Sequence, residues 1–466
     1  MIHLALLLAL AQSDTGEMSM ALRREVAATT HARMRWGDIS DVRDALQRAY
    51  DARGWRPFWS TSGTMTPAGR RLLGELDSAR TRGLDPADYD APMLDRAVAG
   101  LSPANVLDAA EVDVRMSVAA ARHALALSRG RIDPRLLHPL LPAPADSADI
   151  AGLLGELALS GRPDTILRNL EPQHATYVQL VALLARYRGL QAQRTGGTDS
   201  SALRVRQIEL ALERWRWLPH SAAAPWIVVN VPAFRLYALR SDREERGDLL
   251  RMKVVAGEAT EHPTPLMVTQ IVAVQFHPPW LVPATIALRE IRPAALRDSF
   301  FLSHQHYELL SRDSVVAATR ANIARIGTGI DVRQTPGPWN ALGAIKFVTP
   351  NPAAVFMHDT PARADFDRAA RAFSHGCIRV ETPMALAEFA LTGNAAWPAD
   401  RIEDALADTV TLTVALKRPI PVFVLYQTLV PDGSGGLITY PDAYAFDRKL
   451  EAMLRAGFPY RSTLVP

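Results

Sequence analysis

Three residues in the last quarter of the chain could together carry out acyl transfer. Cys377 is the only cysteine among 466 residues, His375 stands two positions before it, and His358 stands 19 residues upstream. The thiolate is the nucleophilic form of cysteine, and a nearby imidazole increases its availability, either as a base or as the imidazolium partner of an ion pair. A solitary thiol beside two histidines therefore suggests covalent catalysis through sulfur. The alternative is a buried, unreactive cysteine.

The neighbouring residues favour the catalytic interpretation. His358 ends an expected strand that would hold its ring, and Asp359 follows at a turn, where it can orient the second ring nitrogen. Gly376 permits a tight turn, so that its amide, with those of His375 and Cys377, can point at one spot and stabilise an oxyanion. We therefore expect His358 to be the base and His375 to line the site.

Two further inferences at this stretch are a positive charge for substrate binding and a possible metal site. Arg379 carries a fixed positive charge suited to a substrate carboxylate. A zinc site built on His358, His375 and Cys377 is a possible alternative, although the spacing lacks a recurrent zinc pattern. The interpretation without a metal or an organic cofactor is therefore preferred.

Length, composition and charge limit the number of domains and the class of protein that are expected for this chain. A chain of 466 residues is too long for one compact core, so two or three domains are expected. The hydrophobic fraction of 48% and charged fraction of 22% are typical of a soluble globular protein. The net charge of +3 suits an anionic polymer but is far from the dense basic stripe of a nucleic-acid binder. One cysteine excludes an internal disulfide.

The N-terminal half predicts a helical domain behind a short export segment. Residues 1–16 begin with an apolar run, MIHLALLLALA, that resembles a secretory signal or a short anchor. Residues 17–190 are rich in Ala, Leu and Arg at helical spacing and form the expected helical domain. Residues 191–225 are read as a polar linker and a connecting amphipathic helix. Helices are expected within the helical domain at Pro67–Leu76, Val112–Gly130 and Ala175–Tyr187.

At Trp226 the pattern changes to strands, so residues 226–426 are expected to form a mostly β domain. Residues 284–340 interrupt it with a helix at Ile286–Arg297 and a loop-rich tract, which predicts an insertion over the sheet. Residues 427–466 are read as a C-terminal extension. The fold class is therefore multidomain α+β. Strands are expected at 227–231, 234–239, 250–256, 267–276, 353–358, 410–415 and 421–426, with a helix opened by Thr382 and Pro383 through Leu391.

These stretches resemble a known family. The run HDTP at His358–Pro361, followed by SHGCIRV at Ser374–Val380, is similar to the signature of the L,D-transpeptidase catalytic domain of the YkuD type. The resemblance extends to the large periplasmic YcbB-like subgroup, whose scaffold domain is similar to the helical half of this chain. Further matching runs are ERWRWLP at 213–219, NVPAF at 230–234, NALG at 340–343, and Lys346 with Phe347.

The resemblance implies a role for each matching residue. It makes Cys377 the nucleophile and His358 the general base, with His375 and Gly376 at the catalytic centre. The insertion at 284–340 corresponds to a capping subdomain that helps to form the substrate groove. The implied substrate-binding residues are Ser374, Arg379, Asp359, Asn340, Trp280 and Phe356.

Two departures from the subgroup affect substrate contacts. A peptidoglycan-binding helical module that is common in the subgroup is absent, since only about a dozen residues separate Gly189 from the helix at Ala202. Phe356 stands where a tyrosine is often found, which removes a hydroxyl near the base. Neither departure touches the nucleophile or the base.

The implied reaction is 3→3 cross-linking of peptidoglycan through a Cys377 thioester, with release of D-alanine from tetrapeptide stems and sensitivity to carbapenems. The alternatives are an L,D-carboxypeptidase or cross-link-cleaving hydrolase that uses the same site, and an inactive wall-binding scaffold. The expected partners are stem peptides as donor and acceptor, with peptidoglycan synthases as possible further partners. No nucleic acid is expected, and a membrane contact only through an uncleaved N-terminus. These properties predict export to the periplasm or cell envelope.

Overall fold

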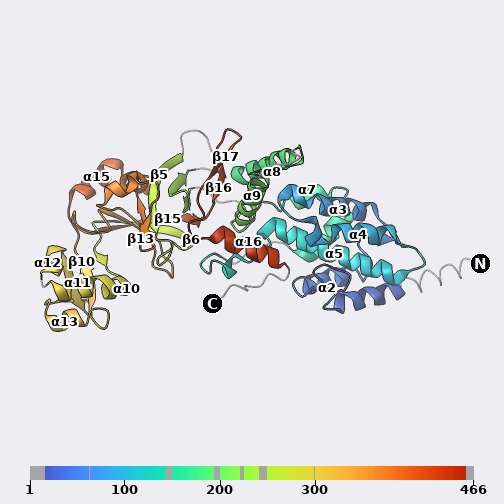
Figure 1. Cartoon of the computed structure of the whole chain (residues 1–466), viewed down its shortest axis with the longest axis horizontal. Coiled ribbons are helices and arrows are strands. Elements are labelled where there is room, and N and C mark those ends of the chain that lie inside the picture. The colour runs from blue at the N-terminus through green and yellow to red at the C-terminus, as the bar shows by residue number, and fades with distance from the viewer. Residues whose placement is uncertain are drawn as a thin grey trace, which may run out of the picture. The chain divides into compact units, whose positions relative to one another are not determined.

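The computed structural model describes residues 16–457 apart from 62, 143–148, 194–199, 221–224, 241–248 and 299. The chain divides into two compact units, one of residues 1–221 with 427–466 and one of residues 222–426. Residues 1–15, on which the expected export signal falls, lie outside the described part. Within that part, no helix is both long and apolar enough to cross a membrane. The chain is a multidomain α+β protein, as the sequence predicts (Figure 1).

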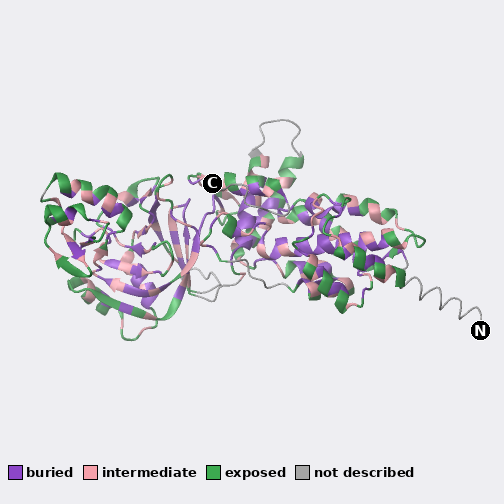
Figure 2. Ribbon diagram, turned by 90° about the horizontal axis from the view of Figure 1, so that it is seen from below, coloured by how far each residue is buried: buried purple, intermediate pink, exposed green. Residues whose placement is uncertain are grey.

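Helix α5 (Val106–Arg129) is the centre of the helical unit. Asn105 caps its first turn by accepting a hydrogen bond from the Asp108 amide, and the helix ends at Gly130, which has a positive φ. Most of its side chains are buried, because other helices cover it on several sides (Figure 2). Other helices of this unit include residues 16–27 and α2 (Arg43–Ala52), α3 (Pro67–Asp77), α4 (Ala91–Ala99), α6 (Ile150–Leu159), α7 (Pro163–Arg168), α8 (Ala175–Gln193), α9 (Ser200–Arg216) and α16 (Phe446–Ala456).

The buried carboxylate of Asp113 joins α5 to the chain before α3. It accepts hydrogen bonds from the backbone amides of Phe58, Trp59 and Ser60 at 2.9, 2.8 and 3.2 Å and from the Tyr50 hydroxyl at 2.8 Å. Burial raises the pKa of Asp113, while these donors favour its charged form. Asp113 therefore satisfies several polar groups in the middle of an apolar core.

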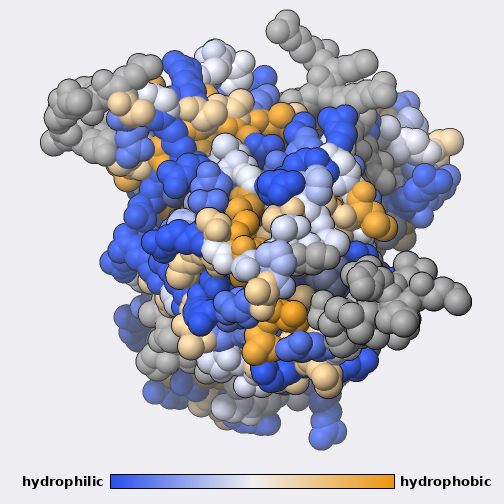
Figure 3. Space-filling view, turned by 90° about the vertical axis from the view of Figure 1, so that its right-hand side faces the viewer, coloured by the Kyte–Doolittle hydropathy of each residue, from blue (hydrophilic) through white to orange (hydrophobic). Residues whose placement is uncertain are grey.

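The ends of the helical unit refine the sequence predictions. Helix α8 continues to Gln193 and α9 begins at Ser200, so both ends of the polar stretch expected as a linker are helical. The described residues after 426 pack with the helical unit: Arg214 on α9 forms an ion pair with Asp447 on α16 at 2.5 Å. Figure 3 shows one face of the molecule covered mainly by hydrophilic side chains, with hydrophobic residues in small separate groups.

The second unit is built on one nine-stranded sheet. Its strands follow the order β13-β5-β14-β12-β11-β6-β15-β3-β4, and β4 also pairs with β5, so that the sheet closes on itself. Two helices, α14 (Pro383–Leu391) and α15 (Ala399–Ala407), follow the strands nearest the Cys-His stretch. The strand bounds are β3 Trp226–Asn230, β4 Arg235–Leu239, β5 Leu249–Gly257, β6 Met267–Phe276, β11 Ile345–Val348, β12 Met357–His358, β13 Ala372–Ser374, β14 Ile378–Val380 and β15 Leu412–Leu425.

Three local predictions are corrected by the structure. The strand expected at 353–358 shrinks to β12, because Ala354 has a positive φ of 52° and the Asn351 side chain binds the Val355 amide. The two strands expected at 410–415 and 421–426 are one strand, β15, whose pairing with β6 shifts register between Ala415 and Ile420. Helix α14 begins after Thr382 as expected, but the Thr382 side chain, a residue type that favours N-capping, does not cap the helix and its hydroxyl contacts Met252 instead.

The insertion has a small sheet and a hydrophobic core of its own. We call it the cap. Its four strands run in the order β7-β10-β8-β9, and a buried cluster that includes Ile291, Leu309 and Val332 packs beside them. Its elements are β7 (Trp280–Leu281), α10 (Ala284–Ile286), the π-helical turn η4 (Ala287–Ile291), α11 (Arg292–Arg297), α12 (Phe301–His304), β8 (Tyr307–Ser311), β9 (Ser314–Val316), α13 (Arg320–Ala324) and β10 (Asp331–Gln334).

Candidate active site

The sheet brings Cys377 and His358 to the same face. Strands β12 and β14 are parallel neighbours in which His358 pairs with Arg379, and the Ile378 amide donates to the Phe356 carbonyl at 2.9 Å. Side chains two residues apart along a strand point to the same side. Cys377, which precedes β14 directly, therefore shares a face with Arg379 and His358. The 19 residues between base and thiol contain the short 3-10 helix η5 (Arg363–Asp367) and β13.

The environment of His358 fixes both its tautomer and its charge. Its side chain is buried, and Nδ1 lies 2.5 Å from the Asp359 carbonyl oxygen, which can only accept, so Nδ1 carries the proton and Nε2 is the basic nitrogen. Burial lowers the pKa of His358 to about 4, helped by the charges of Arg379 and Lys346 and opposed by backbone carbonyl contacts. The imidazole is therefore neutral at neutral pH, as a base requires.

The Asp359 carboxylate holds the turn that follows His358. Its Oδ2 accepts from the Ala344 amide at 2.9 Å, and its Oδ1 pairs with Arg363 at 3.1 Å. Gly343 has a positive φ and packs directly against this carboxylate, leaving no room for a side chain. This carboxylate, to which the resemblance assigns substrate binding, is thus engaged in holding the turn after His358.

The Cys377 thiol is partly exposed and lies in a mixed electrostatic environment. Burial raises the pKa of the thiol, whereas the Phe356 amide and the charges of Lys346 and Arg379 favour the thiolate. Because desolvation is the largest of these effects, the resting cysteine is a neutral thiol. With a neutral His358 beside it, this arrangement favours proton removal during attack over a preformed thiolate–imidazolium pair.

Hydrogen bonds on both sides fix the loop that carries the thiol. Ser374 Oγ accepts from the Gly376 amide at 3.2 Å and donates to the Cys377 carbonyl at 2.5 Å. Thr264 Oγ1 donates to the Gly376 carbonyl at 2.9 Å. Of the three amides expected to bind an oxyanion, that of Gly376 is thus already engaged. The amides of His375 and Cys377 have no partner among the described residues and can serve this purpose.

Three predicted binding residues lie near this centre with distinct surroundings. Arg379 forms an ion pair with Asp365 at 3.0 Å, which offsets part of its charge. Phe356 is half-buried and lies under the Lys346 ammonium, 4.0 Å from its ring centroid. Trp280 is half-buried in β7 of the cap.

Two other predicted residues, Ser374 and Asn340, are buried and serve the backbone. Ser374 lies behind the nucleophile loop. Asn340 is fully buried; its Nδ2 donates to the Pro278 and Thr335 carbonyls at 3.1 and 3.0 Å, and its Oδ1 accepts from the Leu342 amide at 2.8 Å. Both residues position the segments that bear the site.

Sequence reasoning assigned no site role to Lys346, Glu290 or His262. Lys346 pairs with His358 across β11 and β12, so it points to the face that carries the thiol, and burial lowers its pKa. Glu290, from the cap, lies 2.7 Å from His375 Nε2, and the His262 ring centroid is 4.9 Å from that of His375. The alternation of β11 could have indicated Lys346. No local signal links Glu290 or His262 to residues so distant in the chain.

Within the described residues, no group of three or more His, Cys, Asp or Glu side chains is placed to hold a metal ion. This includes the set His358, His375 and Cys377.

Comparison with known proteins agrees with this geometry. Residues 224–403 match the family described as the L,D-transpeptidase catalytic domain (YkuD), and residues 44–184 match the Scaffold domain. A Haemophilus influenzae protein provisionally named as an L,D-transpeptidase is 32% identical over 228 residues, which are 48% of this chain and 45% of that protein. The match thus spans about half the length of this curated relative.

The fold and site therefore define an L,D-transpeptidase-type catalytic domain preceded by a scaffold domain. Residues 224–403 are thus an L,D-transpeptidase catalytic domain of the YkuD type and residues 44–184 a Scaffold domain, which is the YcbB-like architecture that the resemblance predicts.

Proposed function

We propose that this protein is a cysteine-dependent peptidoglycan L,D-transpeptidase that forms 3→3 cross-links and releases D-alanine from tetrapeptide stems. The observation that carries the proposal is the placement of Cys377 and a neutral, tautomer-fixed His358 on one face of adjacent parallel strands. A thiol beside a neutral imidazole suits acyl transfer, in which the proton leaves sulfur as the carbon–sulfur bond forms.

In the first step, the Cys377 sulfur attacks the carbonyl carbon of the third stem residue while His358 Nε2 takes the thiol proton. The negative charge that develops on the carbonyl oxygen is stabilised by the amides of His375 and Cys377. The tetrahedral intermediate collapses by breaking the bond to D-alanine. The proton on His358 passes to the leaving amine, so the thioester forms and His358 is neutral again.

In the second step, the side-chain amine of an acceptor stem attacks the thioester. His358 removes a proton from the attacking nitrogen, the new amide bond forms, and the carbon–sulfur bond breaks. The proton then returns to sulfur. Water in place of the amine would give the hydrolytic product, a tripeptide stem. The same residues serve both outcomes, and the acceptor decides between them.

The test is incubation of the full chain with a disaccharide-tetrapeptide, followed by mass spectrometry. We expect a cross-linked dimer, free D-alanine, and a mass on Cys377 that corresponds to the acyl-enzyme. Cys377→Ala should abolish all three, and His358→Gln should slow D-alanine release by about 10²- to 10⁴-fold. Tripeptide without dimer would instead support the hydrolase, and product formation by Cys377→Ala at the normal rate would refute the thiol mechanism.

We further propose that the protein acts in the cell envelope, where peptidoglycan stems would be its donor and acceptor. Membership of the L,D-transpeptidase family supports this location. Peptidoglycan synthases, which make the glycan strands that carry such stems, are the partners that this reaction would require nearby. Fractionation of cells followed by detection of the chain would test the location.

A further inference from the structure

A second cluster of ionisable side chains lies beside the nucleophile loop, separate from the pair Cys377–His358. Glu290 on η4 of the cap is 2.7 Å from His375 Nε2. The His375 and His262 rings lie 4.9 Å apart, and His262 is 3.9 Å from Glu261. Arg289, next to Glu290 in the cap, is 3.7 Å from Glu261. The cluster thus joins the cap to the connection between β5 and β6.

The backbone holds this cluster close to the reacting sulfur. The connection between β5 and β6 packs directly on the nucleophile loop: Thr264 Oγ1 accepts from the Gly257 amide at 2.8 Å and donates to the Gly376 carbonyl at 2.9 Å. Gly257 has no space for a side chain, because the His262 carbonyl and the Gly376 backbone fill it. His262 and His375 are therefore fixed at the rim around Cys377.

The cluster is exposed to solvent, and one carboxylate oxygen of Glu290 is available to accept a hydrogen bond. The side chains of Glu290 and His375 are 52% and 38% exposed, and Glu290 Oε2 has no hydrogen-bond partner among the described residues. Glu290 lies close enough to raise the pKa of Tyr307, after the larger effect of burial. Tyr307 in turn lies 6.4 Å from Trp280, measured between ring centroids.

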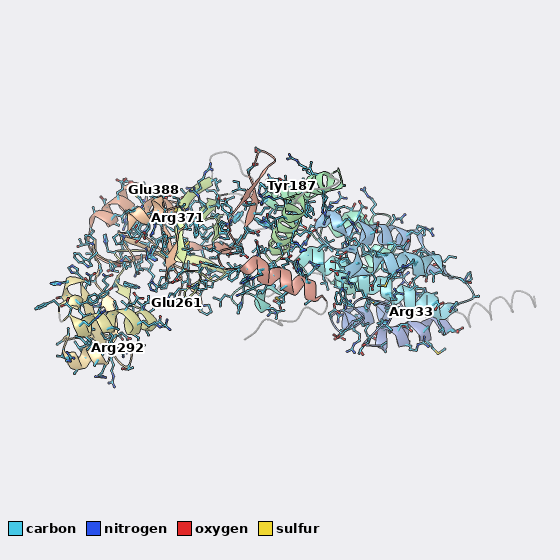
Figure 4. All side chains as sticks on the ribbon, viewed as in Figure 1. Arg33, Tyr187, Glu261, Arg292, Arg371 and Glu388 are labelled. Atoms are coloured by element: carbon cyan, nitrogen blue, oxygen red, sulfur yellow. The ribbon has the colours of Figure 1, made fainter. Side chains whose placement is uncertain are left out.

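These features match the chemistry of a bound ammonium group. A carboxylate with a free oxygen attracts an ammonium, and aromatic rings nearby add cation–π attraction. Arg289 is held toward Glu261, which lies beside the cap in Figure 4, so the arginine charge is directed to a different carboxylate from that of Glu290. Because Arg289 offsets the charge of Glu261, Glu290 supplies the net negative charge of the cluster at the rim.

We propose that Glu290, with His375 and the Trp280–Tyr307 wall of the cap, forms the subsite that receives the ammonium of the acceptor before it attacks the thioester. This proposal rests on the proposed function and assigns residues to its second step. The subsite would favour a cationic amine over water, and so would favour transfer over hydrolysis. Glu290 and His375 are separated by 85 positions in the chain, and the cap brings them together.

The acceptor arrives as an ammonium beside the Glu290 carboxylate and releases one proton through His375 to solvent. The resulting neutral amine attacks the thioester carbon. Its second proton passes to His358 as the carbon–nitrogen bond forms. The carbon–sulfur bond then breaks, and His358 returns that proton to Cys377. The net change is one ammonium and one thioester converted to one amide, one thiol and one proton.

The test compares Glu290→Gln with the control Glu308→Gln in the full chain. Glu308 is also in the cap and pairs with Arg333 at 2.5 Å, away from the cluster. Three quantities are measured with tetrapeptide donor: D-alanine release, the ratio of dimer to tripeptide, and the ratio of hydroxamate to tripeptide when hydroxylamine is the acceptor. Hydroxylamine is largely uncharged at neutral pH, so it reports attack that does not depend on ammonium binding.

We expect Glu290→Gln to lower the dimer-to-tripeptide ratio by about fivefold, the effect of losing one partly exposed ion pair. D-alanine release in the absence of added hydroxylamine and the hydroxamate ratio should stay within about twofold of the parent, and Glu308→Gln should change none of the three. An unchanged dimer ratio would overturn the subsite, as would an equal fall in the dimer and hydroxamate ratios, which would mean that Glu290 acts through the geometry of the loop. Failure of the parent chain to form any dimer would refute the transpeptidase function itself.

Discussion

His358 and Arg379 stand opposite each other on the parallel strands β12 and β14. This pairing puts the base and a permanent positive charge side by side, with Cys377 two positions before Arg379 on the same face. Lys346 completes a row across the sheet, since it pairs with His358 from the other side. A buried imidazole between two cations resists protonation, which keeps it available as a base.

The pH dependence of acylation and alkylation of Cys377 should distinguish a neutral Cys377–His358 pair from a thiolate–imidazolium ion pair. The pKa of His358 is lowered to about 4 and that of the Cys377 thiol is raised, so both groups are neutral between these values. Acylation should therefore be flat from about pH 5 to pH 8 and fall as His358 becomes protonated at lower pH. Alkylation of the single cysteine by iodoacetamide should keep rising above pH 8. A plateau in alkylation below pH 7 would indicate a thiolate–imidazolium pair instead.

Lys346→Met should raise the pKa values of both catalytic groups, because the ammonium lowers each of them. Methionine keeps the length of the side chain and removes the charge. We expect alkylation at pH 8 to slow by about three- to tenfold, since a smaller fraction of the thiol is ionised. The acidic limb of the acylation profile should move to higher pH.

Lys346→Arg is the matched control for this charge. This variant should leave the acidic limb of the acylation profile and the rate of alkylation at pH 8 close to those of the parent. Identical profiles for the parent and Lys346→Met would contradict an electrostatic role for this residue.

Thr264→Val should disturb the nucleophile loop without changing any group that reacts. Valine has nearly the same shape but lacks the hydroxyl that connects the Gly257 amide to the Gly376 carbonyl. The loss of these two buried hydrogen bonds should cost about 1–3 kcal/mol in the free energy of unfolding and slow the acylation of Cys377. Thr260→Val, in the same connection but exposed, is the control and should behave as the parent in both measurements.

Asp113→Ala should destabilise the helical unit strongly. The change leaves the amides of Phe58, Trp59 and Ser60 without their acceptor inside an apolar core. We expect the free energy of unfolding of this unit to fall by about 3–5 kcal/mol. Unfolding in urea, monitored by tryptophan fluorescence, measures this change. Asp44→Ala, at a site 83% exposed, should have little effect. A similar midpoint for both variants would show that Asp113 is not a structural centre.

Elements with a complete local pattern could be predicted from the sequence. Strand β6 (Met267–Phe276) and helix α14 (Pro383–Leu391) have the expected bounds, because β-branched runs and a proline at the first helical turn act over a few neighbouring residues. The strand expected at 353–358 was too long, since a left-handed residue at Ala354 cannot be read from an alanine. A local sequence pattern therefore predicts where helices and strands form, but not where a left-handed residue interrupts them.

The site could be predicted only where its residues are close in sequence or match a signature. The types and spacing of His358 and Cys377 predict a base and a nucleophile, and the structure brings both residues to one face. The contact between Glu290 and His375 depends on how the cap folds onto the sheet, and the engagement of the Gly376 amide by Ser374 depends on the rotamer of one hydroxyl. Such contacts follow from tertiary packing, on which a single sequence carries little information.

The cap leaves and rejoins the sheet at adjacent points. Trp280 on β7 pairs directly with Gln334 on β10, so the chain departs and returns through two neighbouring strands. The polypeptide between them contains its own small sheet and its own apolar cluster. The cap can therefore be exchanged for a short turn, or for the equivalent piece of a relative, without threading any new connection through the catalytic sheet. Replacement of this one contiguous segment would thus remove the contact of Glu290 with His375, while Cys377 and His358 keep their places on the catalytic sheet.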